Sequence, residues 1–239
     1  MERFLNNAGT RLWSIGTGSG MPVILCNGGP GCDDYLGPVA AMIEDRCQVI
    51  RFEPRGCGRS DRDGRYDLDT AVADVDFVRR AYGIDRAIIA GHSAGVDTAL
   101  AYAMRHAGHV LSVIGLSGGR IVNDREWSRI YKENLATRGE DLGGKVFDAD
   151  PEVNKVGNAT WREFITRPTL LRDLAGIQVL AVFINAGDDI RPNWPTRQLA
   201  HLLPKARYVE IAGAGHCSWL SHPADLQREL RTALAIIDS

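Results

Sequence analysis

The sequence contains no long hydrophobic run. Its longest uninterrupted apolar segments, Ala99 to Met104 and Val179 to Ile184, have six residues each, whereas a helix that spans a membrane needs about 20. The first residues, Met1 to Asn7, also lack the apolar stretch of a secretory signal peptide. We therefore expect a cytoplasmic protein that does not span a membrane.

Cysteine pairs and metal-binding motifs are missing as well. The five cysteines form an odd, scattered set without a C-x-x-C pair, which argues against a disulfide framework and a cysteine-based zinc site. The histidines show neither H-x-x-x-H nor H-E-x-x-H spacing. We expect reduced thiols, no metal and no cofactor.

An excess of basic residues is absent too. The 28 lysine and arginine residues are balanced by 30 aspartate and glutamate residues, which gives a net charge of −2. Proteins that bind nucleic acid neutralise phosphates with clustered lysine and arginine side chains. The sequence therefore predicts no nucleic-acid partner, and nothing in it predicts an oligomeric state.

What the sequence does contain is the composition of a globular protein. Apolar residues make up 44% and charged residues 24% of its 239 residues, both ordinary values for a folded chain. At about 100–200 residues per domain, this length corresponds to one large domain or to one domain with an insertion.

Short apolar runs rich in β-branched residues alternate with helical patterns. They lie at 23–26, 49–52, 87–90, 110–116, 179–184 and 208–211. Most are continuously apolar, as in a parallel sheet that is covered on both faces. The segment 11–15 alternates instead and is typical of an antiparallel edge strand.

One helix is well marked after the second of these strands. Apolar residues recur at three- and four-residue steps from Leu68 to Tyr82, with Asp67 placed to cap the start and Gly83 to end it. Further helices are predicted at 94–106, 194–203 and 224–237. Strands that alternate with helices predict an α/β fold with a doubly wound, mostly parallel sheet.

This alternation breaks between about 118 and 173. That stretch has no strand-like run but carries several aromatic residues among many charges. We predict a small helical cap at 118–173, inserted into a core domain formed by residues 1–117 and 174–239.

A G-x-S-x-G motif, Gly91 to Gly95, follows the predicted strand at 87–90 and opens the helix at 94–106. In this context the motif forms a sharp turn that presents its serine above the sheet. Gly91 and Gly95 are required because a Cβ atom would collide with the neighbouring strand or helix, and Ser93 is expected to be strained. Ser93 is the candidate nucleophile, and the Ala94 N–H at the helix N-terminus can face a developing oxyanion.

A second oxyanion donor is expected from the loop after an earlier strand. The strand at 23–26 runs into Asn27-Gly28-Gly29-Pro30-Gly31. Paired glycines let the backbone approach a substrate carbonyl, and a proline stiffens the turn. The Gly29 N–H is the predicted donor, and the Gly28 N–H is the alternative.

These motifs resemble the α/β-hydrolase superfamily. The resemblance is carried by Asn27 to Gly31, Arg55 to Ser60 and Gly91 to Gly95 in that order, and it covers nearly the whole chain. The most similar branch contains the proline iminopeptidases, whose oxyanion loop reads His-Gly-Gly-Pro-Gly; Asn27 stands where that branch has histidine. The resemblance implies an α/β-hydrolase fold and a Ser-His-Asp triad.

The superfamily orders its triad as serine, acid, histidine, which implies partners after the last two predicted strands. His216, between glycines, is the candidate base because imidazole titrates near neutrality. Asp188 and Asp189 compete as the acid. The superfamily's acid lies a few residues before a proline, and Pro192 therefore favours Asp189.

The resemblance implies a serine hydrolase of the carboxylesterase type, which cleaves a small ester or amide through an acyl-enzyme on Ser93. The insertion is shorter than the cap of the proline iminopeptidases, and its acids match none of their amine-binding positions, so an aminopeptidase of that type is the alternative. A lyase and a ligand receptor on the same fold also stay open. The expected partner is a small ester, amide or short peptide.

Overall fold

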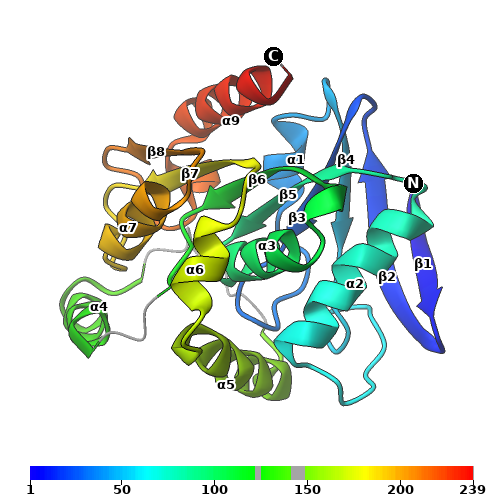
Figure 1. Cartoon of the computed structure of the whole chain (residues 1–239), viewed down its shortest axis with the longest axis horizontal. Coiled ribbons are helices and arrows are strands. Elements are labelled where there is room, and N and C mark those ends of the chain that lie inside the picture. The colour runs from blue at the N-terminus through cyan, green and yellow to red at the C-terminus, as the bar shows by residue number, and fades with distance from the viewer. Residues whose placement is uncertain (122–124, 141–148, 239) are drawn as a thin grey trace.

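A computed structural model describes residues 1–121, 125–140 and 149–238, and its centre is an eight-stranded sheet (Figure 1). The strands follow the order β1-β2-β4-β3-β5-β6-β7-β8. Pairing is parallel from β4 to β8 and antiparallel at β1 and β2. The predicted doubly wound, mostly parallel α/β sheet is confirmed. The strand bounds are β1 Glu2–Asn7, β2 Thr10–Thr17, β3 Met21–Cys26, β4 Cys47–Phe52, β5 Ala87–His92, β6 Val110–Leu116, β7 Leu180–Ala186 and β8 Ala206–Ile211.

The prediction of an edge strand at 11–15 is wrong in one respect. This segment lies in β2 and pairs antiparallel with β4, as an early strand should, but β1 pairs along its other side. Only Leu5 of β1 is buried. With one buried side chain, β1 has no apolar alternation that a sequence pattern could reveal.

Helices cover both faces of the sheet. On one face lie α2 (Leu68–Ala81), α3 (Ala94–Arg105), α6 (Leu170–Ala175) and α7 (Trp194–Leu202), which share one hydrophobic core. On the other lie α1 (Gly37–Ala41), α8 (Ser218–Ser221) and α9 (Pro223–Asp238), which share a second core. Figure 1 shows α2, α3 and α6 in front of the strands. Successive strand residues serve the two cores in turn, as Ile88 and Ile89 of β5 do.

The best-marked predicted helix forms as expected. The Asp67 carboxylate accepts a hydrogen bond from the Thr70 N–H at 2.8 Å and caps α2. The apolar stripe of the helix, which includes Val72, Val75 and Val78, is buried. Gly83 follows the helix with a φ of 68°. The helices predicted at 94–106, 194–203 and 224–237 are α3, α7 and α9.

The described part of residues 118–173 contains α4 (Arg125–Arg138), α5 (Pro151–Thr166) and the start of α6. Helix α5 docks on the core through two polar contacts. The Asn154 side chain donates to the Pro30 carbonyl at 2.8 Å, and Thr160 Oγ1 accepts from the Leu68 N–H at 3.1 Å. Helix α5 therefore touches the loop that follows β3.

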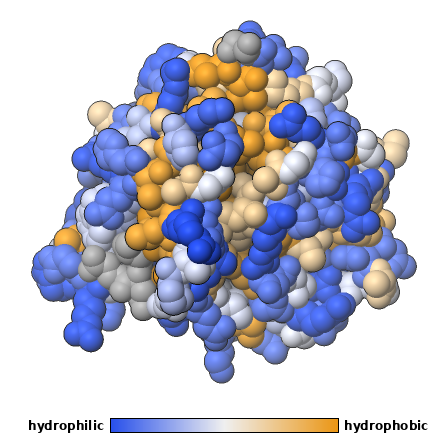
Figure 2. Space-filling view, in the orientation of Figure 1, coloured by the Kyte–Doolittle hydropathy of each residue, from blue (hydrophilic) through white to orange (hydrophobic). Residues whose placement is uncertain are grey.

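The surface is polar around its margin. In the face shown in Figure 2, hydrophilic side chains form most of the rim, and apolar side chains show between them near the middle. Within the described ranges, no helix has the length and hydrophobicity that crossing a membrane requires.

Candidate active site

Ser93 lies at the sharp turn between β5 and α3. Its backbone has φ 54° and ψ −121°, a strained conformation for serine, as predicted. A Cβ atom on Gly91 would lie 2.2 Å from the carbonyl carbon of Gly95, and one on Gly95 would lie 2.1 Å from the Cys26 carbonyl oxygen. The expected need for glycine at both positions is confirmed.

Two backbone N–H groups are available beside Ser93. Gly29 and Ala94 line the same cavity as Ser93, and neither N–H donates a hydrogen bond to any residue that the structure describes. The Gly28 N–H, in contrast, is buried and donates to Tyr35 Oη at 2.6 Å. The alternative oxyanion donor is thus already bonded, and Gly29 remains the predicted one.

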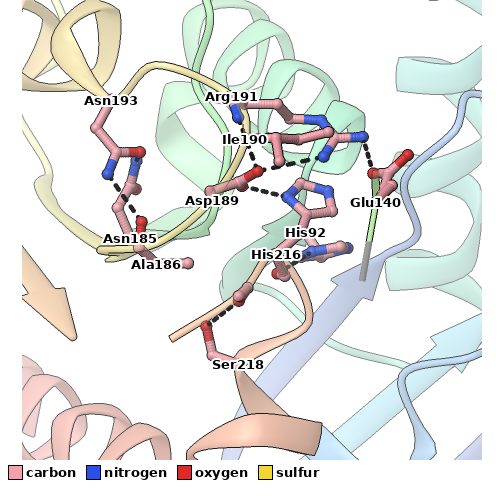
Figure 3. A network of polar contacts seen from close by, with 12 residues as sticks. His92, Glu140, Asn185, Ala186, Asp189, Ile190, Arg191, Asn193, His216 and Ser218 are labelled. Carbon is pink, nitrogen blue, oxygen red and sulfur yellow. Dashed lines mark hydrogen bonds and ion pairs between the residues drawn. The ribbon is translucent and has the colours of Figure 1, made fainter. Parts of the chain in front are cut away.

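The structure brings Asp189 and His216 together at the ends of β7 and β8 (Figure 3). His216 Nδ1 lies 2.5 Å from Asp189 Oδ2, and both side chains are buried. This contact leaves His216 Nε2 as the nitrogen that can serve Ser93. No hydrogen bond between Ser93 and His216 is formed in the described structure; catalytic hydrogen bonds often tighten only when substrate binds.

The groups around Asp189 stabilise its negatively charged form. Burial alone would raise the pKa of this carboxyl, but the hydrogen bond to His216 and the nearby positive charge of Arg191 outweigh it and hold the pKa below its ordinary value. Asp189 Oδ1 accepts from the Arg191 backbone N–H at 2.9 Å, and the guanidinium of Arg191 reaches on to Glu140. Sequence reasoning gave Arg191 no role, although it lies only two residues after the candidate acid Asp189.

The carboxylate of Asp188, the neighbouring residue, pairs with a different side chain. Asp188 is 63% exposed and pairs with Arg138 at 2.8 Å, whereas the Asp189 side chain is 2% exposed. The two candidate acids are therefore separated by environment, and only Asp189 contacts the imidazole.

His92, the residue before Ser93, is also part of this region. Its Nδ1 lies 2.7 Å from Tyr35 Oη, and its Nε2 lies 3.1 Å from the backbone carbonyl oxygen of His216. Figure 3 shows the His92 and His216 side chains close together. The sequence motif alone assigned no function to His92 or Tyr35.

A cavity of about 290 Å³ opens at Ser93. Asp189, Gly29 and Ala94 line it on the core side. Aromatic residues of α4 and α5, Trp127, Tyr131 and Trp161, line it as well. The segment predicted to form a cap therefore contributes to the wall of the cavity.

Some residues that line the cavity carry buried polar atoms without a partner. In the part of the chain that the structure describes, four such side-chain atoms form no hydrogen bond, namely Asn27 Oδ1, Asp97 Oδ1, Trp161 Nε1 and Asn185 Oδ1. Buried polar groups in folded proteins nearly always have partners, and exceptions call for an explanation.

Asp97 is the carboxylate in this set. It lies on α3 among buried apolar residues, four positions after Ser93. Burial raises the pKa of Asp97 well above its ordinary value, and the positive charge of Arg120 opposes the effect only in part. Sequence reasoning missed Asp97, although an acid on the buried face of the helix after the candidate nucleophile was a usable signal.

The gain in unfolding free energy from replacing Asp97 with asparagine should grow as the pH rises. The folded-state pKa of Asp97 is raised, so its favourable contribution is complete below the unfolded pKa of about 3.9 and is lost as the pH rises through the folded pKa. Asparagine does not ionise, so its contribution to folding stability is not lost as the pH rises. Urea unfolding of both proteins between pH 4 and 8 should show the variant gaining about 1.4 kcal/mol of unfolding free energy for each unit by which the pKa is raised. A difference that stays constant with pH would contradict this explanation.

The described residues include no cluster of three or more histidine, cysteine, aspartate or glutamate side chains that could hold a metal ion. The five cysteines of the chain are all buried.

Part of the sequence is similar to known proteins. The sequence profile of the alpha/beta hydrolase fold family matches residues 21–153, more than half of the chain. A proline iminopeptidase of Heyndrickxia coagulans is 37% identical over 123 residues, which cover 49% of this chain and 41% of that protein. The chain spans less than half the length of the curated relatives it matches first.

Solved structures resemble the entire chain. A thermophilic esterase from Thermogutta terrifontis has a TM-score of 0.80 at 17% identity, with 100% of both chains covered. A proline iminopeptidase of Mycobacterium smegmatis has a TM-score of 0.78 at 15% identity, with 100% of this chain and 99% of that chain covered. At such identities the likeness shows a shared fold.

Proposed function

This chain belongs to the α/β-hydrolase fold family, and we propose that it is a serine hydrolase that cleaves small esters or amides through an acyl-enzyme on Ser93. The observation that supports the proposal is that Ser93, Asp189 and two residues with available N–H groups line one cavity, and that Asp189 contacts His216. Nucleophile, base, acid and oxyanion donors are the parts that acyl transfer requires.

The proposed reaction has two halves. Ser93 Oγ attacks the substrate carbonyl carbon while its proton passes to His216 Nε2, and the Gly29 and Ala94 N–H groups bind the oxyanion. His216 then protonates the leaving alcohol or amine, and the acyl group stays on Ser93. Water attacks the acyl-enzyme, gives its proton to His216, and the acid leaves as Ser93 regains its hydrogen. Asp189 stabilises the imidazolium throughout.

Initial rates on p-nitrophenyl butyrate and proline p-nitroanilide test the substrate class. We expect faster turnover of the ester with little cleavage of the anilide, because the aromatic wall of the cavity suits an apolar acyl group. A strong preference for the anilide would favour the aminopeptidase described next. If the folded protein turned over neither substrate, a lyase or a receptor would replace the hydrolase.

Asp97 favours a second candidate, an aminopeptidase of the proline-iminopeptidase type. Asp97 lies in the first turn of the helix that follows Ser93, and both residues line the same cavity, so Asp97 lies near the serine that attacks the carbonyl. The α-ammonium of an aminoacyl substrate is two bonds from that carbonyl carbon. Such a group would give Asp97 Oδ1, which has no hydrogen-bond partner among the described residues, a cationic partner.

The variant Asp97→Asn separates the two candidates. If Asp97 binds an ammonium group, the ratio of kcat/KM for proline p-nitroanilide to kcat/KM for p-nitrophenyl butyrate should fall about tenfold or more, because a hydrogen bond to a charged group contributes about 1.5–3 kcal/mol. An unchanged ratio would exclude this role and leave the ester and amide hydrolase.

A further inference from the structure

We propose that Tyr35 and His92 are positioning residues, which fix the loops carrying Gly29, Ser93 and His216 relative to one another through a single chain of hydrogen bonds. The proposal rests on the hydrolase function above and assigns a task to two side chains that do not contact the reacting atoms. It joins three segments that lie far apart in the sequence, because the bonds from His92 span 57 residues to Tyr35 and 124 residues to His216.

The chemistry of the partners fixes the direction of each bond. The His216 carbonyl oxygen can only accept, so His92 Nε2, 3.1 Å away, carries a hydrogen and donates it. In a neutral imidazole, Nδ1 is then an acceptor, and it receives the Tyr35 hydroxyl hydrogen at 2.7 Å. Tyr35 Oη in turn accepts from the Gly28 N–H at 2.6 Å. Each donor in this chain meets one acceptor.

The surroundings keep His92 neutral. Burial lowers the pKa of His92 well below its ordinary value, and the nearby His216 lowers it further. The two imidazole rings are only 4.6 Å apart between centroids. A neutral His92 therefore does not oppose the positive charge that His216 gains when it accepts the serine proton.

The hydrogen bonds of Tyr35 and His92 also orient the loop that carries Gly28 and Gly29. Because Tyr35 holds the Gly28 N–H, the loop is fixed at the residue before Gly29. A Cβ atom on Gly28 would lie 3.0 Å from the Ser93 Cβ atom, so this point of the loop packs directly against the nucleophile. Fixing Gly28 therefore fixes where the Gly29 N–H lies relative to Ser93.

Trp219 on α8 holds the two side chains in place. Its ring stacks on Tyr35 with centroids 5.9 Å apart and meets His92 edge-on at 4.7 Å. Tyr35, His92 and Trp219 are all buried. Packed aromatic neighbours restrict the rotamers of both positioning residues, which preorganises the loops before substrate arrives.

The kinetic test compares Tyr35→Phe with a matched control. We expect Tyr35→Phe to lower kcat for p-nitrophenyl butyrate about tenfold or more, since small displacements of catalytic groups have effects of up to about a hundredfold, with KM changed less than threefold. The control is Tyr102→Phe, which removes another buried hydroxyl with two partners, Asp76 and Arg79. It should keep kcat within twofold, at a temperature where both variants are folded.

A kcat within twofold of the wild type in Tyr35→Phe would overturn the proposal, as would an equal loss of kcat in Tyr102→Phe. The first result would show that the hydroxyl does not position the loops. The second would show that the loss follows general destabilisation.

A second measurement does not depend on activity. In protein labelled with ¹⁵N-histidine, NMR should show His92 as the neutral form protonated on Nε2 throughout pH 6–8. A ring that titrates in this range, or carries its hydrogen on Nδ1, would overturn the proposal even if Tyr35→Phe failed to fold. If the wild type hydrolysed no ester, the hydrolase function would fail, and the His92 tautomer would still decide whether the hydrogen-bonded chain exists.

Discussion

Replacing Ser93 with alanine should lower kcat for ester hydrolysis by about a thousandfold or more, to the level that oxyanion binding alone supports. Alanine lacks the hydroxyl oxygen on which the proposed acyl-enzyme forms, so neither half of the proposed reaction can proceed through it. The substitution changes one atom at a position whose backbone conformation is set by the turn and its glycines. The folded structure and the unfolding temperature should therefore change little.

Ser117 provides the matched control. It also lines the cavity and also has a positive φ, 46°, but it follows β6 and begins no helix. Ser117→Ala should retain activity within about threefold, since a side chain outside the reaction contributes little to the transition state. If Ser93→Ala kept more than a tenth of the wild-type rate, or if Ser117→Ala lost as much as Ser93→Ala, Ser93 would not be the nucleophile.

The second large effect is expected at Asp189. Asp189→Asn should lower kcat by about 10³–10⁴-fold, because an amide donates where the carboxylate accepted, favours the wrong imidazole tautomer and does not stabilise the imidazolium. The Asp189 side chain is buried, and its Oδ2 lies 2.5 Å from His216 Nδ1. The variant keeps the shape of the side chain, so the loss should appear in kcat more than in KM.

Its control is the adjacent residue. Asp188→Asn makes the same chemical change on a side chain that is 63% exposed and pairs with Arg138. Exposed ion pairs contribute about 0–1 kcal/mol, so this variant should keep kcat within about twofold. A larger loss at Asp188 than at Asp189 would reverse the assignment of the acid.

Much of the fold could be predicted because its central strands are buried on both faces. Continuous apolar runs such as those of β5 and β7 indicate a parallel sheet without further information. The stripe of α2 and its cap at Asp67 could be identified in the same way. The edge strand β1 could not, because five of its six residues lie at least partly exposed and its pairing with β2 is set by backbone hydrogen bonds.

The residues of the candidate site also differ in how well the sequence could predict them. Ser93, Gly29 and His216 lie in loops whose glycines and positions after strands mark them within a few residues of sequence. Tyr35 and His92 carry no such mark, because their bonds join residues that only the folded sheet brings together. Asp97 was missed because a helical position reveals burial, whereas the lack of a partner depends on all the side chains around it.

The central claim is that Ser93 is a nucleophile activated by His216, and covalent labelling tests it most directly. The intact protein should be incubated with a fluorophosphonate, which phosphonylates activated serines, and its mass measured before and after digestion. We predict the addition of one phosphonyl group on the peptide that contains Ser93, and its loss in both Ser93→Ala and His216→Ala. No mass increase in the folded wild type, or a label on a different serine, would contradict the account.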